Sequence, residues 1–526
     1  MTEPNQTGAA QARYEQLASE REHFISRGDK AAGLTLPTLF RRGGAASKNT
    51  NIKDAHQSLG ARGVNTLASK MTLSLFPTNT PFFKYNVDTL KLKEEGEGEK
   101  ETEIKKGLGV IERAIVRKVE DTGDVTAAFE ALKHLVITGN VLLHVTATGS
   151  RIFDLNKYVV SRDPEGTVME IVVCEQMSPT ALSPEARSIY AQAESSLSES
   201  PDKTIPVYTH IKVSKGRVKY HQELSGIVIP GTSSEVPEEG SPWLALRFTR
   251  VDGENYGRGY VEMYMGDLES LEVLSKAVRD AAVASSKVIW LVRPNGSTNP
   301  RVIATADNNS VRTGDANDVT ALRLDKAADL RVAENMIKSL ESRLAYAFML
   351  SSEVMRDAER VTAEEVRFVA QELDDSLGGI YSILSKDFQL PYVKRRIHLM
   401  LKDGEIPKLP DIVNPVIVTG FAALGRGHDR DKLIRYASTL AEVVGPERLE
   451  MYIDLDELAS RLAVADGIET EGLLVTKEAR DAKAQEAQQG AMAQQITPEL
   501  VKQVGGLVQQ QQTAPQQPQQ GNPANG

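Results

Sequence analysis

Apolar side chains recur at three- and four-residue intervals over long stretches of the chain, which is the pattern of amphipathic helices. Good helix formers without glycine or proline predict a first helix over 11–27. The same spacing predicts a second helix over 59–75 that stops at Pro77, because proline cannot continue a helix. It also predicts helices over about 104–119 and 124–138. The N-terminal part of the chain is therefore expected to be helical.

From Asn140 to Arg250 the pattern changes to short, β-branched segments bounded by Gly, Asp and Pro, which predicts strands. These segments are NVLLHVTA, KYVVSR, TVMEIVVCEQ, TIPVYTHIKVS, RVKYHQE and PWLALRFTR. The charge run KLKEEGEGEKETEIKK at 91–106 predicts a solvated loop. Together with the helices, these strands predict an α+β fold that is mainly helical.

Two later helices carry a narrow 3-4 apolar spacing, which is typical of helices that pack side by side. The first is predicted within 262–287 and the second over 327–349. Their apolar positions are Leu271, Leu274, Val278, Ala281 and Ser285 in the first helix, and Leu330, Ala333, Ile337, Leu340, Leu344 and Ala347 in the second. Taken alone, this periodicity favours a helical hairpin buried inside one subunit.

Between the two helices, residues 288–326 predict a compact β insert with VIWLV, RVIATA and ALRLD as strands. After the second helix, Thr362 and Glu365 fit a capping box that starts another helix. Residues 416–480 are expected to be mostly helical. The glutamine-rich end of the chain is expected to be disordered, because it has few large apolar side chains.

Composition adds limits to this picture. The chain has 526 residues, 40% of them hydrophobic, which is enough for several ordinary globular domains. No apolar run approaches the roughly 20 residues that span a bilayer, and the polar N-terminus does not resemble a signal peptide. We therefore expect no membrane contact and a chain that stays in the cytoplasm where it was made. Cys174 is the one cysteine, so no intrachain disulfide can form, and it is expected to be a core residue.

The net charge of −10 argues against tight binding of duplex DNA, which needs a basic surface to neutralise phosphates. It does not argue against a protein through which DNA passes without being held. Motifs for common chemistry are absent: the sequence has no GxxxxGK[ST], HExxH, CxxC or GxSxG. His134 and His144 have no carboxylate nearby in sequence, and YGRGYV at 256–261 predicts a tight turn that leads into the helix. We expect no enzyme activity, no cofactor and no metal.

Four strings resemble the portal, or head–tail connector, proteins of short-tailed phages of the autographivirus type. They are SLGARGVNTLASKMTLSLFP, PWLALRFTRVDGENYGRGYVEMYMGDL, SSKVIWLVRPNG and ERVTAEEVRFVAQELDDSLGGIYSILSKDFQLP. The order helix, insert, helix, loop and long helix also matches. The resemblance implies a portal fold with wing, stem, clip and crown, assembled as a dodecameric ring at one capsid vertex of the virion.

The resemblance also implies a division of the chain. Its parts would be a wing (1–261 and 362–430), two stem helices (262–287 and 327–349), a clip (288–326), a tunnel loop (350–361), crown helices (431–480) and a glutamine-rich tail without an assigned role (481–526). Leu271, Leu274, Val278, Ile337, Leu340 and Leu344 would pack between neighbouring stems. Trp290, Arg293 and Arg301 would lie on the clip. Glu353, Val354, Met355, Arg356, Asp357, Glu359 and Arg360 would line the DNA channel.

The implied function is genome packaging, head–tail joining and DNA ejection. The implied partners are further copies of the chain, double-stranded DNA in transit, the terminase large subunit, a tail adaptor protein, the major capsid and scaffolding proteins, and internal core proteins. Two other hypotheses stay open at this point. A phage nuclease or ATPase would need a metal-binding carboxylate cluster or a P-loop. A monomeric scaffold or DNA-processing accessory protein would bury the 3-4 apolar sides of the two helices, which we call the seam, inside one subunit.

Overall fold

The computed structural model divides into two compact units, residues 1–424 and 425–526. It describes residues 9–43, 55–77, 82–87, 101–193, 204–286, 289–322, 327–350, 373, 377, 379–407, 413–417, 421–445, 448, 451–455, 458, 459 and 462. In the second unit the described residues are chiefly those of α14 (Phe421–Val444), which begins just before the boundary. None of the helices in these ranges combines the length and apolar character needed to cross a bilayer. The remaining elements belong to the first unit.

The N-terminal helices match the apolar spacing. They are α1 (Ala9–Gly33), α2 (Leu59–Leu75), α4 (Glu101–Asp121) and α5 (Asp124–Thr138). Val64, Leu67 and Met71 of α2 are fully buried, because their spacing puts them on one face, against α5 and the rest of the core. The helix α4 starts within the charge run, so the expected loop at 91–106 was wrong for residues 101–106.

The strand block forms two sheets. The larger has the order β4-β5-β6-β7-β8, with β9 also paired to β7, and the smaller has the order β10-β2-β3. Their bounds are β2 (Asn140–Thr146), β3 (Gly149–Phe153), β4 (Tyr158–Arg162), β5 (Val168–Met177), β6 (Ile205–Ser214), β7 (Arg217–Leu224), β8 (Ile227–Val228), β9 (Ser234–Pro237) and β10 (Trp243–Arg247). These strands confirm the predicted change from helix to strand after residue 139.

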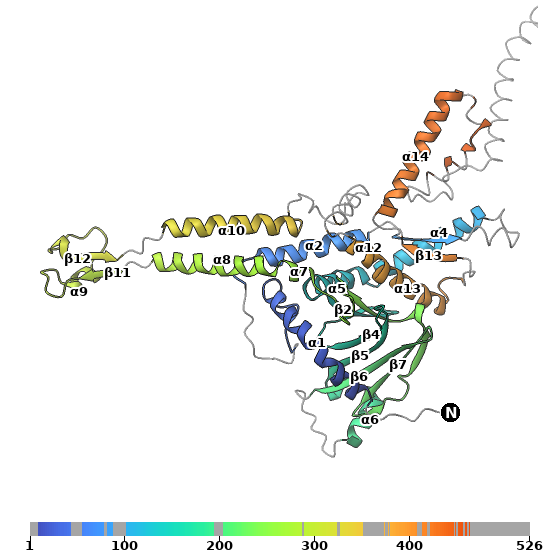
Figure 1. Ribbon diagram of the computed structural model, residues 1–526, viewed down its shortest axis with the longest axis horizontal. Helices are drawn as coiled ribbons and strands as arrows, with labels where there is room; N and C mark the ends of the chain where they lie inside the picture. Colours follow the sequence, from blue (N-terminus) through green and yellow to red (C-terminus); the bar gives the residue numbers. More distant parts are fainter. Residues whose placement is uncertain are drawn as a thin grey trace, which may run out of the picture. The chain divides into compact units, whose positions relative to one another are not determined.

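One face of the larger sheet is covered by α1 (Figure 1). Leu17 of α1 packs with Val172 of β5 and Tyr208 of β6 in a separate apolar cluster. Cys174 is half-buried at the edge of this cluster, as expected of a packing residue. The first helix of the chain is therefore held against the central strands of the sheet.

A second small sheet joins distant parts of the chain. In it, β1 (Phe83–Val87) pairs antiparallel with β13 (Val413–Ile417). Near β13 the chain runs as one continuous helical stretch through α12 (Ile380–Leu384), a π-helical turn (Ser385–Gln389) and α13 (Leu390–Lys402). The π turn precedes Pro391, which lacks an N–H and so cannot make the regular helical hydrogen bond.

The helix α13 is tied to the core by a buried ion pair. Arg396 and Asp124, the first residue of α5, are both almost completely buried and form a salt bridge. The Tyr392 hydroxyl donates to the same carboxylate oxygen, and Arg396 Nη1 donates to the Thr146 carbonyl at 2.8 Å. Burial, followed by the Asp124 charge, holds the pKa of Tyr392 well above its usual range. The pair fastens the C-terminal helix of the unit to its N-terminal half.

The remaining elements include two long helices, α8 (Met265–Ser286) and α10 (Ala327–Ala347). The others are short: η3 (Pro179–Ala181), α6 (Pro184–Ala193), η4 (Glu238–Gly240), α7 (Tyr260–Met263), β11 (Ile289–Val292), α9 (Pro300–Ala304), η5 (Ala316–Asp318) and β12 (Val319–Leu322). The predicted strand RVIATA was wrong, because its first four residues lie in α9 and Thr305 caps that helix. Asn299 accepts a hydrogen bond from the Arg301 N–H as a helix cap, and Pro300 begins the helix with a backbone angle suited to that position.

Candidate functional site

The most distinctive feature of the first unit is a long helical hairpin, residues 265–347. In it, α8 and α10 lie side by side, and the elements between them form a small tip (Figure 1). The tip contains the antiparallel pair β11–β12, the short helix α9 and the turn η5. The predicted order of helix, small insert and helix is thus confirmed.

Apart from Ser285, which is exposed, the predicted seam positions are buried or half-buried within a single chain. Leu271 and Leu344 are 0% exposed and Leu340 is 4% exposed within a single chain. Leu274 and Ile337 are partly buried against the same core, and Val278 is half-buried. Leu271 and Leu344 therefore have no exposed area within one chain and Leu340 has almost none, and their packing between subunits stays a prediction. The 3-4 spacing identified the apolar side of each helix. Because the two helices fold back on each other, these apolar sides are buried within the chain.

The opposite faces of both helices remain exposed and carry large apolar side chains. Val273 of α8 is 65% exposed and Tyr346 of α10 is 82% exposed. The other members of this set are Val283 of α8, and Val332 and Met336 of α10. We call these five residues the outer face. The last turns of α8 add exposed small residues, Ala282, Ala284 and Ser285, which allow another helix to come close. Such a surface is typical of a protein–protein contact.

The base of the hairpin is fixed to the core by packing at the end of α10. The Tyr260 hydroxyl donates to the Ala347 carbonyl at 2.8 Å, and Lys70 Nζ donates to the Met349 carbonyl at 3.1 Å. Phe348 packs against Gly63 of α2, where an added Cβ would lie only 2.6 Å from the Phe348 ring. These contacts attach the end of the hairpin to the helical core.

The start of the hairpin is set by a close crossing of backbones. Gly139 ends α5 with φ of 76°, and a Cβ there would lie 2.4 Å from the Arg258 carbonyl carbon. Gly259 would place a Cβ 2.4 Å from the Ile137 carbonyl oxygen. The prediction of a tight turn at YGRGYV was wrong, because Arg258 forms an antiparallel bridge with Thr249 and Gly259 is extended, with φ of −77° and ψ of 153°.

Ion pairs join α8 to neighbouring elements. His56 Nδ1 lies 2.6 Å from Glu272 Oε1, and the Glu272 carboxylate also accepts from the His56 backbone N–H. Arg343 of α10 lies 3.3 Å from Asp267 near the start of α8. These side chains are at least partly exposed, so each pair stabilises the hairpin by about 1 kcal/mol or less.

The tip is organised around Asp318. Its Oδ2 accepts hydrogen bonds from the backbone N–H groups of Ser297 at 2.7 Å and Thr298 at 3.2 Å. Burial alone would raise the pKa of Asp318, but these hydrogen bonds lower it below its usual range. Gly296 lies directly against the carboxylate, where a Cβ would be 2.5 Å away. The turn is thereby held in one shape.

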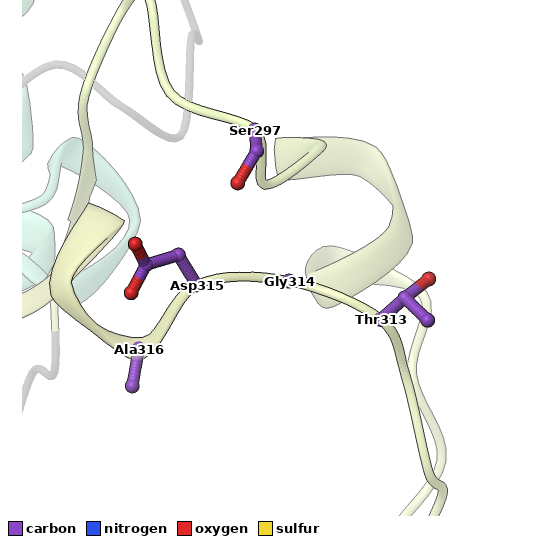
Figure 2. A pocket seen from close by; sticks show the side chains of 5 residues that line it. All are labelled: Ser297, Thr313, Gly314, Asp315 and Ala316. Carbon is purple, nitrogen blue, oxygen red and sulfur yellow. The ribbon is translucent and has the colours of Figure 1, made fainter.

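The residues predicted for the clip lie on this tip and face solvent. Trp290 is 56% exposed, and Arg293 and Arg301 are exposed. A shallow pocket nearby is lined by Ser297, Thr313, Gly314, Asp315 and Ala316 (Figure 2). Asp315 is the ionisable side chain of this lining, and its Oδ1 accepts a hydrogen bond from the Asn317 N–H at 2.9 Å.

The histidines considered from sequence have structural surroundings. Burial lowers the pKa of His134 and of His144 to about 4 each. His144 also stacks on Trp243 with ring centroids 3.9 Å apart. Burial raises the pKa of the Cys174 thiol, which makes a thiolate nucleophile unfavourable.

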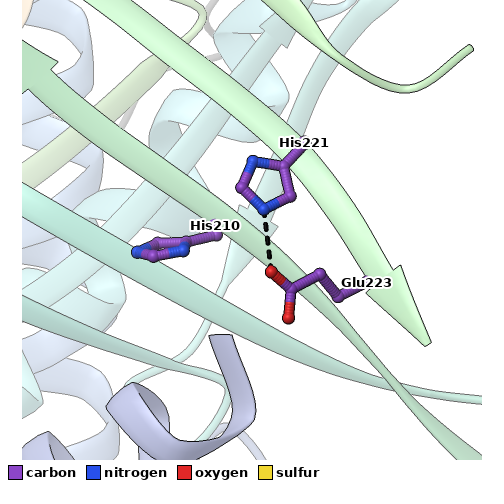
Figure 3. A group of neighbouring side chains, drawn as sticks. All are labelled: His210, His221 and Glu223. Atoms are coloured by element: carbon purple, nitrogen blue, oxygen red, sulfur yellow. Dashed lines mark hydrogen bonds and ion pairs between the residues drawn. The ribbon is translucent and has the colours of Figure 1, made fainter. Parts of the chain in front are cut away.

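One group of side chains in the described ranges has the composition of a metal site, and the sequence motifs did not reveal it. His210 of β6 and His221 and Glu223 of β7 offer ligand atoms that all lie within 4.8 Å of one another (Figure 3). Their spacing along the chain matches no common metal motif, since strand pairing brings them together.

Several predictions fall outside the described residues. These include the channel-lining residues Glu353, Val354, Met355, Arg356, Asp357, Glu359 and Arg360, the capping box at Thr362 and Glu365, and the tail at 481–526.

Comparison with known proteins gives consistent matches. Residues 7–474 match the family model described as bacteriophage head to tail connecting protein. The chain is 39% identical over 494 residues to the portal protein of Escherichia phage T7, covering 92% of this chain and 91% of that protein. It is 38% identical over 495 residues to the portal protein of Enterobacteria phage T3, covering 92% of each. Among solved structures, a chain in the neck of a native GTA particle aligns with a TM-score of 0.33 and 10% identity, covering 77% of this chain and 89% of that one.

Proposed function

Because the chain belongs to the family of bacteriophage head to tail connecting proteins, we propose that it is a portal protein. It forms a ring at one vertex of the capsid, through which the genome is packaged and later ejected, and to which the tail is joined. The observation that carries this proposal is the 39% identity, over 92% of the chain, to a protein named as a portal protein.

The ring is assembled from many copies of this chain, twelve in the form that the resemblance implies. A ring needs a heterologous contact, in which one surface of a subunit meets a different surface of the next. The outer face of α8 and α10 supports this proposal, because Val273, Val332 and Tyr346 there are more than half exposed in the described part of the chain. The small residues at the end of α8 let a neighbouring helix approach. Stem contacts therefore use the outer face rather than the buried seam.

The parts of the chain then have separate roles. The helices and sheets of the first unit form the wing, within 1–261 and 362–430, and the hairpin helices, within 262–287 and 327–349, form the stem. Residues 288–326 form the clip, 350–361 form the tunnel loop and 431–480 form the crown. The exposed Trp290, Arg293 and Arg301 support a binding role for the clip, toward the terminase large subunit during packaging and a tail adaptor afterwards. The wing and crown contact the capsid, scaffolding and internal core proteins.

DNA moves through the ring without being held by it. The chain carries a net charge of −10, which argues against tight binding of DNA phosphates. Sliding requires weak binding without base recognition. The energy for packaging comes from a separate ATPase, which agrees with the lack of a P-loop in this sequence.

The proposal is tested by imaging the purified full-length protein in negative stain and weighing the particles by mass photometry. Rings with a central hole and a mass that is an integral multiple of 57.5 kDa are expected. A stable monomer would support the accessory-protein hypothesis instead. ATP hydrolysis or DNA cleavage that copurifies with the chain, and that one substitution in it removes, would support the enzyme hypothesis.

The role of the clip is tested with Trp290→Ser. The exposed side chain contributes little to the fold, so rings should form normally, whereas binding of the terminase large subunit or the tail adaptor should weaken. Val311→Ser is the matched control, because Val311 is an exposed apolar residue of the same tip, 98% exposed, outside the strand pair. Unchanged binding of both partners by Trp290→Ser would contradict this role.

A further inference from the structure

The larger sheet of the first unit carries a cluster of two imidazoles and two carboxylates between its strands and α1. His210 on β6 and His221 on β7 are direct cross-strand partners in the register. Glu223 lies two residues after His221 and therefore on the same face of β7. Glu170 of β5 completes the cluster on that face, with its Oε1 2.6 Å from His210 Nε2.

Two members of the cluster are almost completely shielded from water. Glu223 is 2% exposed and His210 is 3% exposed, whereas the His221 side chain is 30% exposed. Buried carboxylates are costly unless charge and hydrogen bonds compensate them. Arg13 of α1 balances Glu170, with its Nε 2.7 Å from Glu170 Oε2. No arginine or lysine in the described ranges is paired with Glu223, whose ionisable partner is His221 at 2.9 Å.

Two of the three proposed ligands, Glu223 and His210, have one side-chain atom held by a residue outside the trio. Glu223 Oε2 accepts from the Ala10 N–H at the start of α1 at 3.0 Å, while Oε1 lies 2.9 Å from His221 Nε2. His210 uses Nε2 for Glu170, which leaves Nδ1 for another ligand. In Figure 3 the His221 ring and the Glu223 carboxylate point toward one another, and the His210 ring lies beside them.

We propose that His210, His221 and Glu223 bind a divalent transition-metal ion, Zn²⁺ by preference. Two imidazoles and one carboxylate form a common zinc donor set, with water in the fourth position. The contact of Glu170 with His210 is the second-shell carboxylate that orients a metal-binding histidine. In this arrangement the ion replaces the proton shared between His221 and Glu223, and it balances the carboxylate charge. The partly exposed His221 provides the entry path.

The metal would act as a structural link. Glu223 holds the N-terminus of α1, and Glu170 holds Arg13 of the same helix. An ion bound to β6 and β7 therefore fixes the carboxylate on which α1 rests and stabilises the helix against the sheet. This inference departs from the expectation of no metal, and it does not depend on the portal role.

The first test is titration of the metal-free full-length protein with Zn²⁺ by calorimetry. We expect one Zn²⁺ per chain. His221→Gln should abolish this stoichiometric binding, because the residue is a ligand that folding does not require. His56→Gln is the matched control: His56 also contacts a carboxylate at 2.6 Å but lies outside the cluster, so binding should persist. Glu170→Gln should weaken binding by about 10- to 100-fold, as expected for a second-shell partner.

The second test needs no variant. Co²⁺ bound to the wild-type protein should give the visible absorption of a four- or five-coordinate site with nitrogen and oxygen ligands, and no sulfur charge-transfer band. Such a band would mean that Cys174 is a ligand and would overturn the donor set. Absence of stoichiometric Zn²⁺ binding, or binding that His221→Gln leaves unchanged, would overturn the proposal and leave a hydrogen-bonded network only. Ring images of the same samples report separately on the portal role.

Discussion

The two faces of the hairpin helices predict opposite phenotypes for folding and for assembly. Leu344 is completely buried in the chain, so Leu344→Ala should cost about 2–5 kcal/mol of stability through lost contacts and a cavity. Met336 on the outer face is 52% exposed, and Met336→Asp should change the stability of the isolated chain by about 0.5 kcal/mol or less.

For ring assembly we expect the opposite order of effects, with Met336→Asp more damaging than Leu344→Ala. If the outer face is covered by a neighbour, Met336→Asp buries an unpaired carboxylate at every contact of the ring. The penalty for one buried ion is several kcal/mol, and about 3 kcal/mol already weakens one contact by roughly 100-fold. Because every contact in the ring carries the same penalty, rings should be lost. Val273→Asp on α8 should have the same effect. Leu344→Ala should still form rings wherever the chain remains folded.

The assay combines urea unfolding, followed by circular dichroism, with mass photometry over a range of protein concentrations. Met169→Asp on β5 is the matched control, since Met169 is also a methionine, is 49% exposed and lies outside the hairpin. Wild-type rings from both Met336→Asp and Val273→Asp would refute the outer face as the contact. So would equal loss of rings in Met169→Asp. Loss of rings in Leu344→Ala without loss of stability would restore the seam as an inter-subunit contact.

Four further predictions concern other parts of the chain. Arg396→Leu should cost about 3–5 kcal/mol in urea unfolding, because it leaves a buried carboxylate uncompensated, whereas Lys394→Leu on the same helix, in an exposed ion pair, should cost about 1 kcal/mol or less; equal costs would contradict the buried-pair argument. Burial alone would raise the pKa of Glu170, but hydrogen bonds from His210 and Arg13 lower it from 4.5 to about 2. Its stabilisation is therefore present above about pH 4.5 and lost as the pH falls toward 2, so the stability difference between wild type and Glu170→Gln should shrink over that interval in acid titrations followed by circular dichroism. Replacing 353–358 by a short Gly-Ser link should spare ring assembly but reduce the packaged genome per particle, and normal filling and retention would remove this loop from the channel. Deleting 485–526 should leave soluble rings, whereas loss of rings in sedimentation would mean that this tail packs against the rest of the protein.

Much of the local structure could be predicted from the sequence. The spacing of Leu271 and Leu274, and of Leu340 and Leu344, identified both the helices and their buried sides. Strands after residue 139 were equally visible, because β-branched residues alternate with turn residues. The exceptions were local as well: in RVIATA, the cap at Asn299 and the proline after it outweighed the β-branched residues.

The candidate sites were less accessible to sequence reasoning. The metal cluster joins His210, His221 and Glu223 through strand register, and its link to Glu170 crosses from β6 to β5. Asp124 and Arg396 are far apart in sequence, and neither carries a local signal of burial or pairing. Charged side chains are usually exposed, so only the packing of α13 against the start of α5 reveals this pair.

By itself, the sequence determined where helices and strands form, which side of each helix is apolar, and the family to which the chain belongs. These properties depend on neighbours a few residues apart and on the order of residues along the chain. Only the tertiary structure decided what each apolar side contacts. The seam of α8 and α10 closes within one chain, because the two helices fold back on each other, and the outer face stays exposed. Contacts between distant residues depend on strand register and helix packing, and no local pattern specifies them.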